Sequence, residues 1–176
     1  MSRQIKNIIT ITFFLICIGL INFAGQNIDI EIRGINAFTF ILIVAVLLQI
    51  IFFIPSFLLK TEKYYDLVGS LTYVTTVSLA YFAVENKTMI DSIIYFYVMV
   101  WASRLGIYLF RRVRNDGKDV RFEKPKRHFF WFLQYWMGQA LWVTLTACAA
   151  IIAILSPEDD TLPVLAIFGM ALWLSG

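Results

Sequence analysis

The feature that most constrains this chain is a series of five long apolar runs separated by short polar loops. Of its 176 residues, 60% are hydrophobic and 15% charged, and the mean hydropathy is +0.74. A helix needs about 20 apolar residues to cross a bilayer, and backbone groups in lipid must be paired within the segment, which leaves helices or closed barrels. Because the runs lack the strict alternation of barrel strands, we predict an all-α, polytopic transmembrane helix bundle.

The runs predict five full spans and a partial sixth, in a single domain covering residues 1–176. The expected spans are 7–24, 37–59, 65–84, 90–110 and 129–155, with a sixth beginning near residue 162. The sixth run reaches the last residue after about 15 positions, which is short of a full crossing. We therefore expect the chain to be the N-terminal part of a longer domain, either as a fragment or as a natural truncation.

Loop charges predict how the spans are oriented. Basic residues gather at the N-terminus and in the second and fourth loops, whereas the fifth loop is acidic. The positive-inside rule then places the N-terminus and the second and fourth loops in the cytoplasm. The fourth loop carries eight cations, which are Arg111, Arg112, Arg114, Lys118, Arg121, Lys124, Lys126 and Arg127.

Arg104 lies inside the fourth run, where an arginine costs about 3 kcal/mol on insertion scales. Helical spacing places it on a polar and aromatic stripe that we expect to face the bundle. The stripe consists of Tyr97, Trp101, Arg104, Tyr108 and Arg111. Two interpretations stay open: the side chain snorkels to the interface, or it faces a polar cavity and pairs with Asp66. Asp66, at the start of the third span, also suits the capping of a helix N-terminus.

The fourth loop combines its cations with acids. Asp116 and Asp119 bracket an expected turn at Gly117, and Asp119, Arg121 and Phe122 form a D-x-R-F set. Topology alone predicts a basic loop that contacts anionic lipid, but the interleaved acids favour a site in which arginines bind phosphates and carboxylates orient them. The chain has neither of the glycine-rich nucleotide motifs, G-x-G-x-x-G and G-x-x-x-x-G-K-S.

The fifth run carries Gln134 and Gln139 at membrane depth, where an amide needs a partner on another helix or on a ligand. Gly138 between them would allow another helix to approach closely. Cys17 and Cys148 lie in apolar runs and indicate small buried side chains rather than a disulfide framework or a metal site.

Four stretches resemble the membrane steroid 5-alpha-reductase-like family, in its bacterial branch. They are "YYDLVGSLTYV", "WASRLGIYLFRR", "DVRF" and "FLQYWMGQALWV", which together cover about residues 60–145 in the order and spacing typical of that family. The resemblance implies a seven-helix reductase that uses NADPH to add hydride to a double bond conjugated to a ketone in a lipid-like substrate. It also implies a multi-pass protein of a bacterial inner membrane.

The same resemblance implies which residues bind the cofactor. Those that match its motifs are Asp66, Trp101, Arg104, Asp119 and Arg121, with Arg111 as a weaker candidate. The family's C-terminal cofactor signature, G-L-W followed by S-R-H-P-N-Y, does not occur in this chain, so we expect it to be incomplete for catalysis. No catalytic residue is assigned, and Glu85, Tyr64 and Tyr65 stay open as groups that hold the substrate ketone.

Two alternatives to the reductase remain. Isoprenylcysteine carboxyl methyltransferases resemble these reductases in their C-terminal, cofactor-binding half, so a methyl donor is an alternative cofactor. A non-catalytic membrane scaffold or remnant would use the basic loop only to contact anionic lipid. We expect no nucleic-acid partner, because the loop is short and lies against the bilayer, and the sequence leaves the oligomeric state open.

Overall fold

Every apolar run folds as a helix in the structure, a computed structural model that describes residues 2–116, 119–156 and 164–175. The helices are α1 (Arg3–Asn22), α2 (Ala37–Leu58), α3 (Tyr65–Ala83), α4 (Met89–Asp116), α5 (Phe129–Leu155) and α6 (Val164–Ser175). The predicted all-α bundle is therefore confirmed. Its partial sixth span corresponds to α6, which is 12 residues long.

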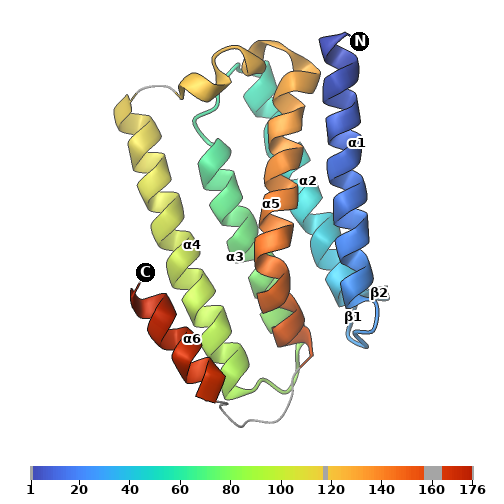
Figure 1. Ribbon diagram of the computed structural model, residues 1–176, viewed down its shortest axis with the longest axis vertical. Helices are drawn as coiled ribbons and strands as arrows, with labels where there is room; N and C mark the ends of the chain where they lie inside the picture. Colours follow the sequence, from blue (N-terminus) through green and yellow to red (C-terminus); the bar gives the residue numbers. More distant parts are fainter. Residues whose placement is uncertain (1, 117–118, 157–163, 176) are drawn as a thin grey trace.

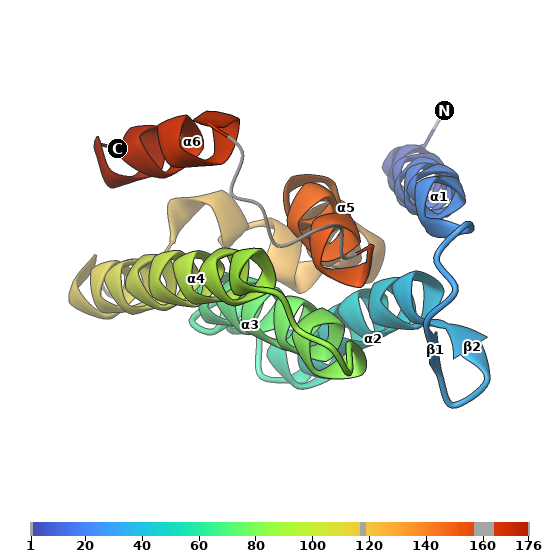
Figure 2. The same cartoon turned by 90° about the horizontal axis from the view of Figure 1, so that it is seen from below.

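The long helices run side by side, and in the end-on view they form two layers (Figure 1, Figure 2). α2, α3 and α4 form one layer, and α1, α5 and α6 lie along its face. α5 is the central helix of the second layer and packs against α1, α2 and α3. The N-terminus, the α2–α3 turn and the α4–α5 loop lie at one end of the bundle (Figure 1). We call this the basic end.

Within the described residues, four helices are long and apolar enough to cross a membrane: α1, α2, α4 and α5. α3 was predicted as a full span but falls below that apolarity, because serines and threonines recur along it. The hydroxyls of Thr72, Thr76 and Ser78 form hydrogen bonds inside the bundle. Thr72 Oγ1 donates to the Val68 carbonyl at 2.7 Å and accepts from Gln49 Nε2 of α2 at 2.9 Å. Since α3 is covered by neighbouring helices, it does not need a fully apolar surface.

A short hairpin that the sequence analysis did not predict connects α1 to α2. Strands β1 (Glu31–Ile32) and β2 (Ile35–Asn36) pair antiparallel around the turn at Arg33 and Gly34. Both turn residues have positive φ, +54° and +76°, the conformation that favours glycine in two-residue hairpins. Asn36 then caps α2 by accepting a hydrogen bond from the Thr39 N–H at 3.0 Å.

α4 extends to Asp116, beyond the predicted end at residue 110, because its arginine-rich end continues the helix. The turn expected at Gly117 lies outside the described residues, and so does the side chain of Asp116. The chain then forms two short 3₁₀ helices, η2 (Val120–Phe122) and η3 (Pro125–Arg127), before α5 begins. We call residues 119–128 the cap segment.

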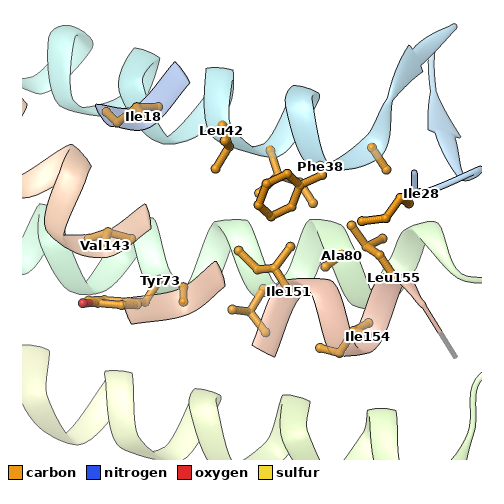
Figure 3. Close-up of a cluster of buried hydrophobic side chains, with 14 of the residues drawn as sticks. Ile18, Ile28, Phe38, Leu42, Tyr73, Ala80, Val143, Ile151, Ile154 and Leu155 are labelled. Carbon is orange, nitrogen blue, oxygen red and sulfur yellow. The ribbon is translucent and has the colours of Figure 1, made fainter. Parts of the chain in front are cut away.

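Two apolar clusters hold the helices together. The larger one lies toward the end of the bundle opposite the basic end, where Phe38, Val77, Ala80 and Ile151 are fully buried between α2, α3 and α5 (Figure 3). The smaller cluster lies near the basic end and includes Phe122 of the cap segment. The cap segment is therefore part of the packed core and not a free loop.

Candidate functional site

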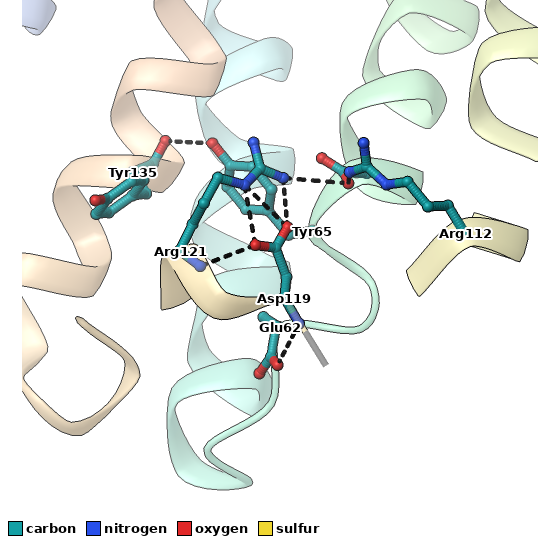
Figure 4. A network of polar contacts seen from close by, with 7 residues as sticks. Glu62, Tyr65, Arg112, Asp119, Arg121 and Tyr135 are labelled. Carbon is teal, nitrogen blue, oxygen red and sulfur yellow. Dashed lines mark hydrogen bonds and ion pairs between the residues drawn. The ribbon is translucent and has the colours of Figure 1, made fainter. Parts of the chain in front are cut away.

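A cluster of paired charges forms where the cap segment folds over the start of α3 (Figure 4). Asp119 caps η2 by accepting from the backbone N–H of Arg121 at 3.0 Å. The same carboxylate accepts from Nε of the Arg121 guanidinium at 3.0 and 2.9 Å. Asp119 and Arg121 thus form a rigid, charge-assisted pair two residues apart.

Asp66, in the first turn of α3, extends this cluster. Its Oδ2 lies 3.4 Å from Nη2 of Arg112 on α4 and 3.6 Å from Nη2 of Arg121. The Asp66 side chain is 13% exposed, whereas those of Arg112 and Arg121 are 41% and 55% exposed. The carboxylates therefore lie inside and hold two guanidinium groups that still present N–H donors to the surroundings. We call Asp66, Arg112, Asp119 and Arg121 the mouth cluster.

The Arg121 side-chain hydrogen bonds keep the pKa of the Asp119 carboxyl below its usual value, although burial opposes this shift. In return, Asp119 raises the pKa of the Arg121 guanidinium above its ordinary value. Both groups are therefore charged at neutral pH. The pair therefore stays ionised over the whole physiological pH range.

Glu62, in the α2–α3 turn, holds the cap segment in place through two hydrogen bonds. Its buried carboxylate accepts from the Asp119 backbone N–H at 3.2 Å and from Lys126 Nζ at 2.7 Å. The two bonds join the start and the end of the cap segment to one side chain. Sequence reasoning missed Glu62, because a glutamate in a polar loop gives no local signal of burial.

Phe122 anchors the cap segment through packing. It is 1% exposed, and its ring lies 4.7 Å from the Tyr65 ring and 5.0 Å from the Tyr135 ring, between centroids. The Tyr65 hydroxyl donates to the Tyr135 carbonyl at 2.9 Å (Figure 4), which ties α3 to α5 beside this ring. The D-x-R-F set therefore has two roles, since its charged residues form the mouth cluster and its phenylalanine fills the core.

A cavity of about 500 Å³ lies beside the mouth cluster, between α3, α4 and α5. Asp66, Gly69, Ser70 and Tyr73 line it from α3, at the spacing that puts four residues on one helix face. The remaining lining residues are Phe14, Tyr65, Trp101, Leu105, Leu109, Arg121, Gln134, Tyr135, Gly138, Gln139, Trp142 and Val143. We call this the first cavity. One end is ionic, and the rest is aromatic and aliphatic with two amides.

Glycines bring the helices around this cavity close together. A side chain at Gly69 would collide with the amide of Gln139, and one at Gly138 would come within 3.2 Å of the Phe14 ring of α1. The close approach predicted for Gly138 is therefore confirmed. The buried atoms Ser70 Oγ and Gln139 Oε1 form no hydrogen bond to any residue that the structure describes. The wall of the first cavity thus has spare hydrogen-bonding capacity.

The structure brings together some of the predicted site residues and separates others. Asp66, Asp119 and Arg121 meet in the mouth cluster, and Trp101 lines the first cavity. The predicted pairing of Arg104 with Asp66 is wrong, because Asp66 pairs with Arg112 and Arg121 instead. Arg104 lines a different cavity, between α4, α5 and α6.

The predicted inward orientation of the α4 stripe is correct for Trp101 and Arg104, which line cavities between helices, and wrong for Tyr108 and Arg111. Trp101, Arg104, Tyr108 and Arg111 are exposed, while Ala102, Gly106 and Val113 form the buried face. Small residues at this contact allow α4 to pack closely on α3, with Gly106 directly against Ser70. Arg111 is exposed and forms no ion pair with the mouth cluster in the described residues, whereas its neighbour Arg112, which the motifs did not single out, belongs to the cluster.

The groups left open for a substrate ketone lie elsewhere or are already paired. Tyr65 donates its hydroxyl to Tyr135, as described above. Tyr64 stacks on Phe110 outside the first cavity, and Glu85 is exposed after the end of α3 that is remote from the mouth cluster. Of the three, Tyr65 alone lines the first cavity, whose other uncharged polar side chains are Ser70, Tyr73, Gln134, Tyr135 and Gln139.

Chemically, the arrangement suits an elongated ligand with an anionic part. Guanidinium groups held by carboxylates and still half exposed are typical of phosphate recognition. The adjoining cavity would receive a largely apolar part and orient it by a few hydrogen bonds.

Comparison with known proteins places the chain in a family. No curated protein and no solved structure matches it. A family model described as "Protein of unknown function (DUF1295)" matches residues 52–176, a range that includes every residue of the mouth cluster. Because this match covers well over half of the sequence, the chain belongs to that family.

Proposed function

We propose that this chain serves an NADPH-dependent membrane reductase, similar to the steroid 5-alpha-reductase-like family, that reduces an enone-type double bond in a lipid-like substrate. The observation that carries the proposal is the mouth cluster, where Asp66 and Asp119 hold two half-exposed guanidinium groups beside the first cavity. The four sequence stretches that resemble the reductases surround this same place.

The residues present fit such a cofactor. Arg112 and Arg121 would hold its phosphates, because their exposed N–H groups are not all used by the two carboxylates. The cavity volume of about 500 Å³ lies within the range of small-molecule sites. NADPH, when bound, supplies a hydride.

The remaining task of the chain's own residues is to orient the substrate and stabilise charge. Negative charge develops on the carbonyl oxygen of an enone during reduction, and a donor in a dry cavity stabilises it. The amides of Gln134 and Gln139 line the first cavity and supply such donors. Trp101 and Tyr73 form an edge-to-face pair, with centroids 4.9 Å apart, that provides an apolar wall and excludes water.

The distribution of basic residues supports the same function. The basic end carries the N-terminus, the α2–α3 turn and the cap segment, and basic loops favour the cytoplasmic side. We infer that the mouth cluster opens toward the cytoplasm of a bacterial inner membrane, where NADPH is available.

The test is cofactor binding by the full chain in lipid nanodiscs, followed through the nicotinamide fluorescence of NADPH. Arg112→Gln and Arg121→Gln should each weaken binding about tenfold or more, as loss of a charge-assisted contact predicts. Arg114→Gln on the same end of α4 makes the same charge change outside the cluster and should leave the affinity unchanged.

Other outcomes would contradict the proposal. Saturable binding of S-adenosylmethionine in place of NADPH would favour the methyltransferase alternative. No saturable binding of either cofactor, together with binding to anionic vesicles that survives shuffling of the loop sequence, would favour the scaffold.

A further inference from the structure

A second cavity, of about 660 Å³, lies between α4, α5 and α6, and no residue of the mouth cluster lines it. Trp173 of α6 lines it and stacks on Tyr97 of α4, with ring centroids 4.5 Å apart and planes 8° from parallel. Aliphatic side chains form much of the remaining wall, among them Val98, Val100, Ala147 and Ala150. The volume falls within the range of sites that bind small molecules.

Arg104 is the charged residue of this wall. Its side chain is exposed, and it forms no hydrogen bond or ion pair with any residue in the described ranges. Arg112 and Arg121, at the basic end, each have a carboxylate partner. A guanidinium stays charged in a protein, and a charge at membrane depth is rare without a partner or a function.

The position of Arg104 restricts the kind of anion that would pair with it. It lies 15 residues after Met89, the first residue of α4, which is roughly 22 Å along the helix at the usual rise. Twelve residues separate it from Asp116 at the other end of α4, or roughly 18 Å. The apolar run ends at residue 110, six residues or roughly 9 Å beyond Arg104, so Arg104 lies inside the apolar part of the helix near the basic end. An anion that itself partitions into the bilayer, with its head group toward that membrane surface, reaches such a charge most readily.

From the isolated cation and the apolar walls we infer that the second cavity binds an anionic amphiphile, with its head group on Arg104 and its chain along α4, α5 and α6. A single-chain carboxylate such as a fatty acid has this chemistry, and so does the phosphate of a bilayer lipid. Trp101 and Trp173 flank the site and would contact the chain. This inference does not depend on the proposed reductase function.

The experiment uses the full chain in nanodiscs of zwitterionic phospholipid and a fatty acid brominated in the middle of its chain, which quenches tryptophan fluorescence on contact. The brominated methyl ester measures the background from unspecific partitioning. We expect saturable quenching by the acid beyond that background. The quenching should shrink in Trp173→Phe, which removes one reporter while keeping an aromatic ring.

Substitution of Arg104 tests the head-group contact. Arg104→Gln should weaken acid binding about tenfold or more, and Arg104→Lys should retain part of it, because a lysine keeps the charge without the planar fork. Arg114→Gln is the matched control. Adding phosphatidylglycerol to the nanodiscs distinguishes the two sources: displacement of the acid supports a bilayer lipid, and lack of displacement supports a single-chain carboxylate.

Two results would overturn the inference: equal binding of acid and methyl ester to the unmodified chain, or equal acid binding by the Arg104→Gln variant. Titration of the same variant with NADPH separates this site from the first. If Arg104→Gln loses NADPH affinity while fatty-acid binding is unchanged, Arg104 belongs to the cofactor site, and the inference fails while the proposed function stands.

Discussion

Lys126 donates a hydrogen bond to Glu62 at 2.7 Å, although the two residues are 64 positions apart. The glutamate side chain is 4% exposed and the lysine side chain 20%. Because the Glu62 carboxylate also accepts from the Asp119 N–H, it connects the α2–α3 turn to both ends of the cap segment. The geometry of the mouth cluster depends on this connection.

The first prediction concerns the different burial of Glu62 and Lys126. Lys126→Gln leaves a buried carboxylate without its charged partner and should lower the free energy of unfolding by about 3 kcal/mol or more. Glu62→Gln keeps an acceptor for Asp119 and leaves only a partly exposed lysine, so it should cost about 1–2 kcal/mol. Thermal unfolding in nanodiscs would measure both, with the exposed neighbour Lys63→Gln as control. Equal effects of the two substitutions would contradict the burial argument.

The second prediction concerns acid. Because hydrogen bonds from Arg121 lower the pKa of Asp119, the folded state binds this proton more weakly than the unfolded chain does. The stabilisation is therefore complete above the unfolded pKa of about 3.9, and it is lost as the pH falls through the lower, folded pKa. Pepsin digestion at a series of acidic pH values should show the cap segment becoming cleavable only below about pH 4.

Asp119→Asn should make the cap segment cleavable already above about pH 4, since the amide does not ionise and cannot form the charged pair with Arg121. Asp29→Asn, an exposed carboxyl before the hairpin, should keep the unmodified profile. A cap segment that opens above the ordinary aspartate pKa in the unmodified chain would show that Asp119 does not control it.

The third prediction concerns helix approach. A methyl group at Gly106 would come within 2.7 Å of Ser70 Cβ, which cannot move without its helix. Gly106→Ala should therefore separate α3 from α4 and cost about 1–3 kcal/mol. Gly19→Ala meets no atom within 4 Å, so it should be neutral or stabilise α1 by up to about 1 kcal/mol. Unfolding experiments on both variants test this contrast, and a stabilised Gly106→Ala protein would contradict the close packing.

The fourth prediction separates packing from charge in the cap segment. Phe122→Ala removes a buried ring from between Tyr65 and Tyr135 and should cost about 3–5 kcal/mol. Val120→Ala, two residues away in the same turn and 72% exposed, should change stability by less than about 0.5 kcal/mol. Limited proteolysis near neutral pH should show the cap segment released in the first variant and retained in the second.

The helices were predictable because each is encoded by its own apolar run. The limits of α2, α3 and α5 agree with the prediction within one residue, since polar residues follow each run directly. The hairpin at Arg33 was missed, because strands of two residues carry no alternation. The end of α4 was missed because arginines that lie outside the apolar run still favour a helix.

The site was predictable only in part. Asp66, Asp119 and Arg121 were found through short motifs, but their contacts depend on how the cap segment folds across α3. The rotation of α4 about its own axis decides whether Arg111 or Arg112 reaches Asp66. It is set by the buried small residues Ala102 and Gly106, since Gly106 lies directly against Ser70 of α3. A stripe chosen by polarity alone therefore gave the wrong orientation at Tyr108 and Arg111.

The two cavities share part of their walls, because both Tyr73 and Trp101 line each of them. Tyr73 is held in place by a hydrogen bond between its hydroxyl and Thr146 Oγ1, at 2.5 Å. Of the two side chains that separate the cavities, the Trp101 indole is therefore the one that can rotate more easily. A ligand that rotated this indole on binding in one cavity would change the shape of the other cavity. Thermodynamic linkage then requires the influence to be mutual and equal in both directions.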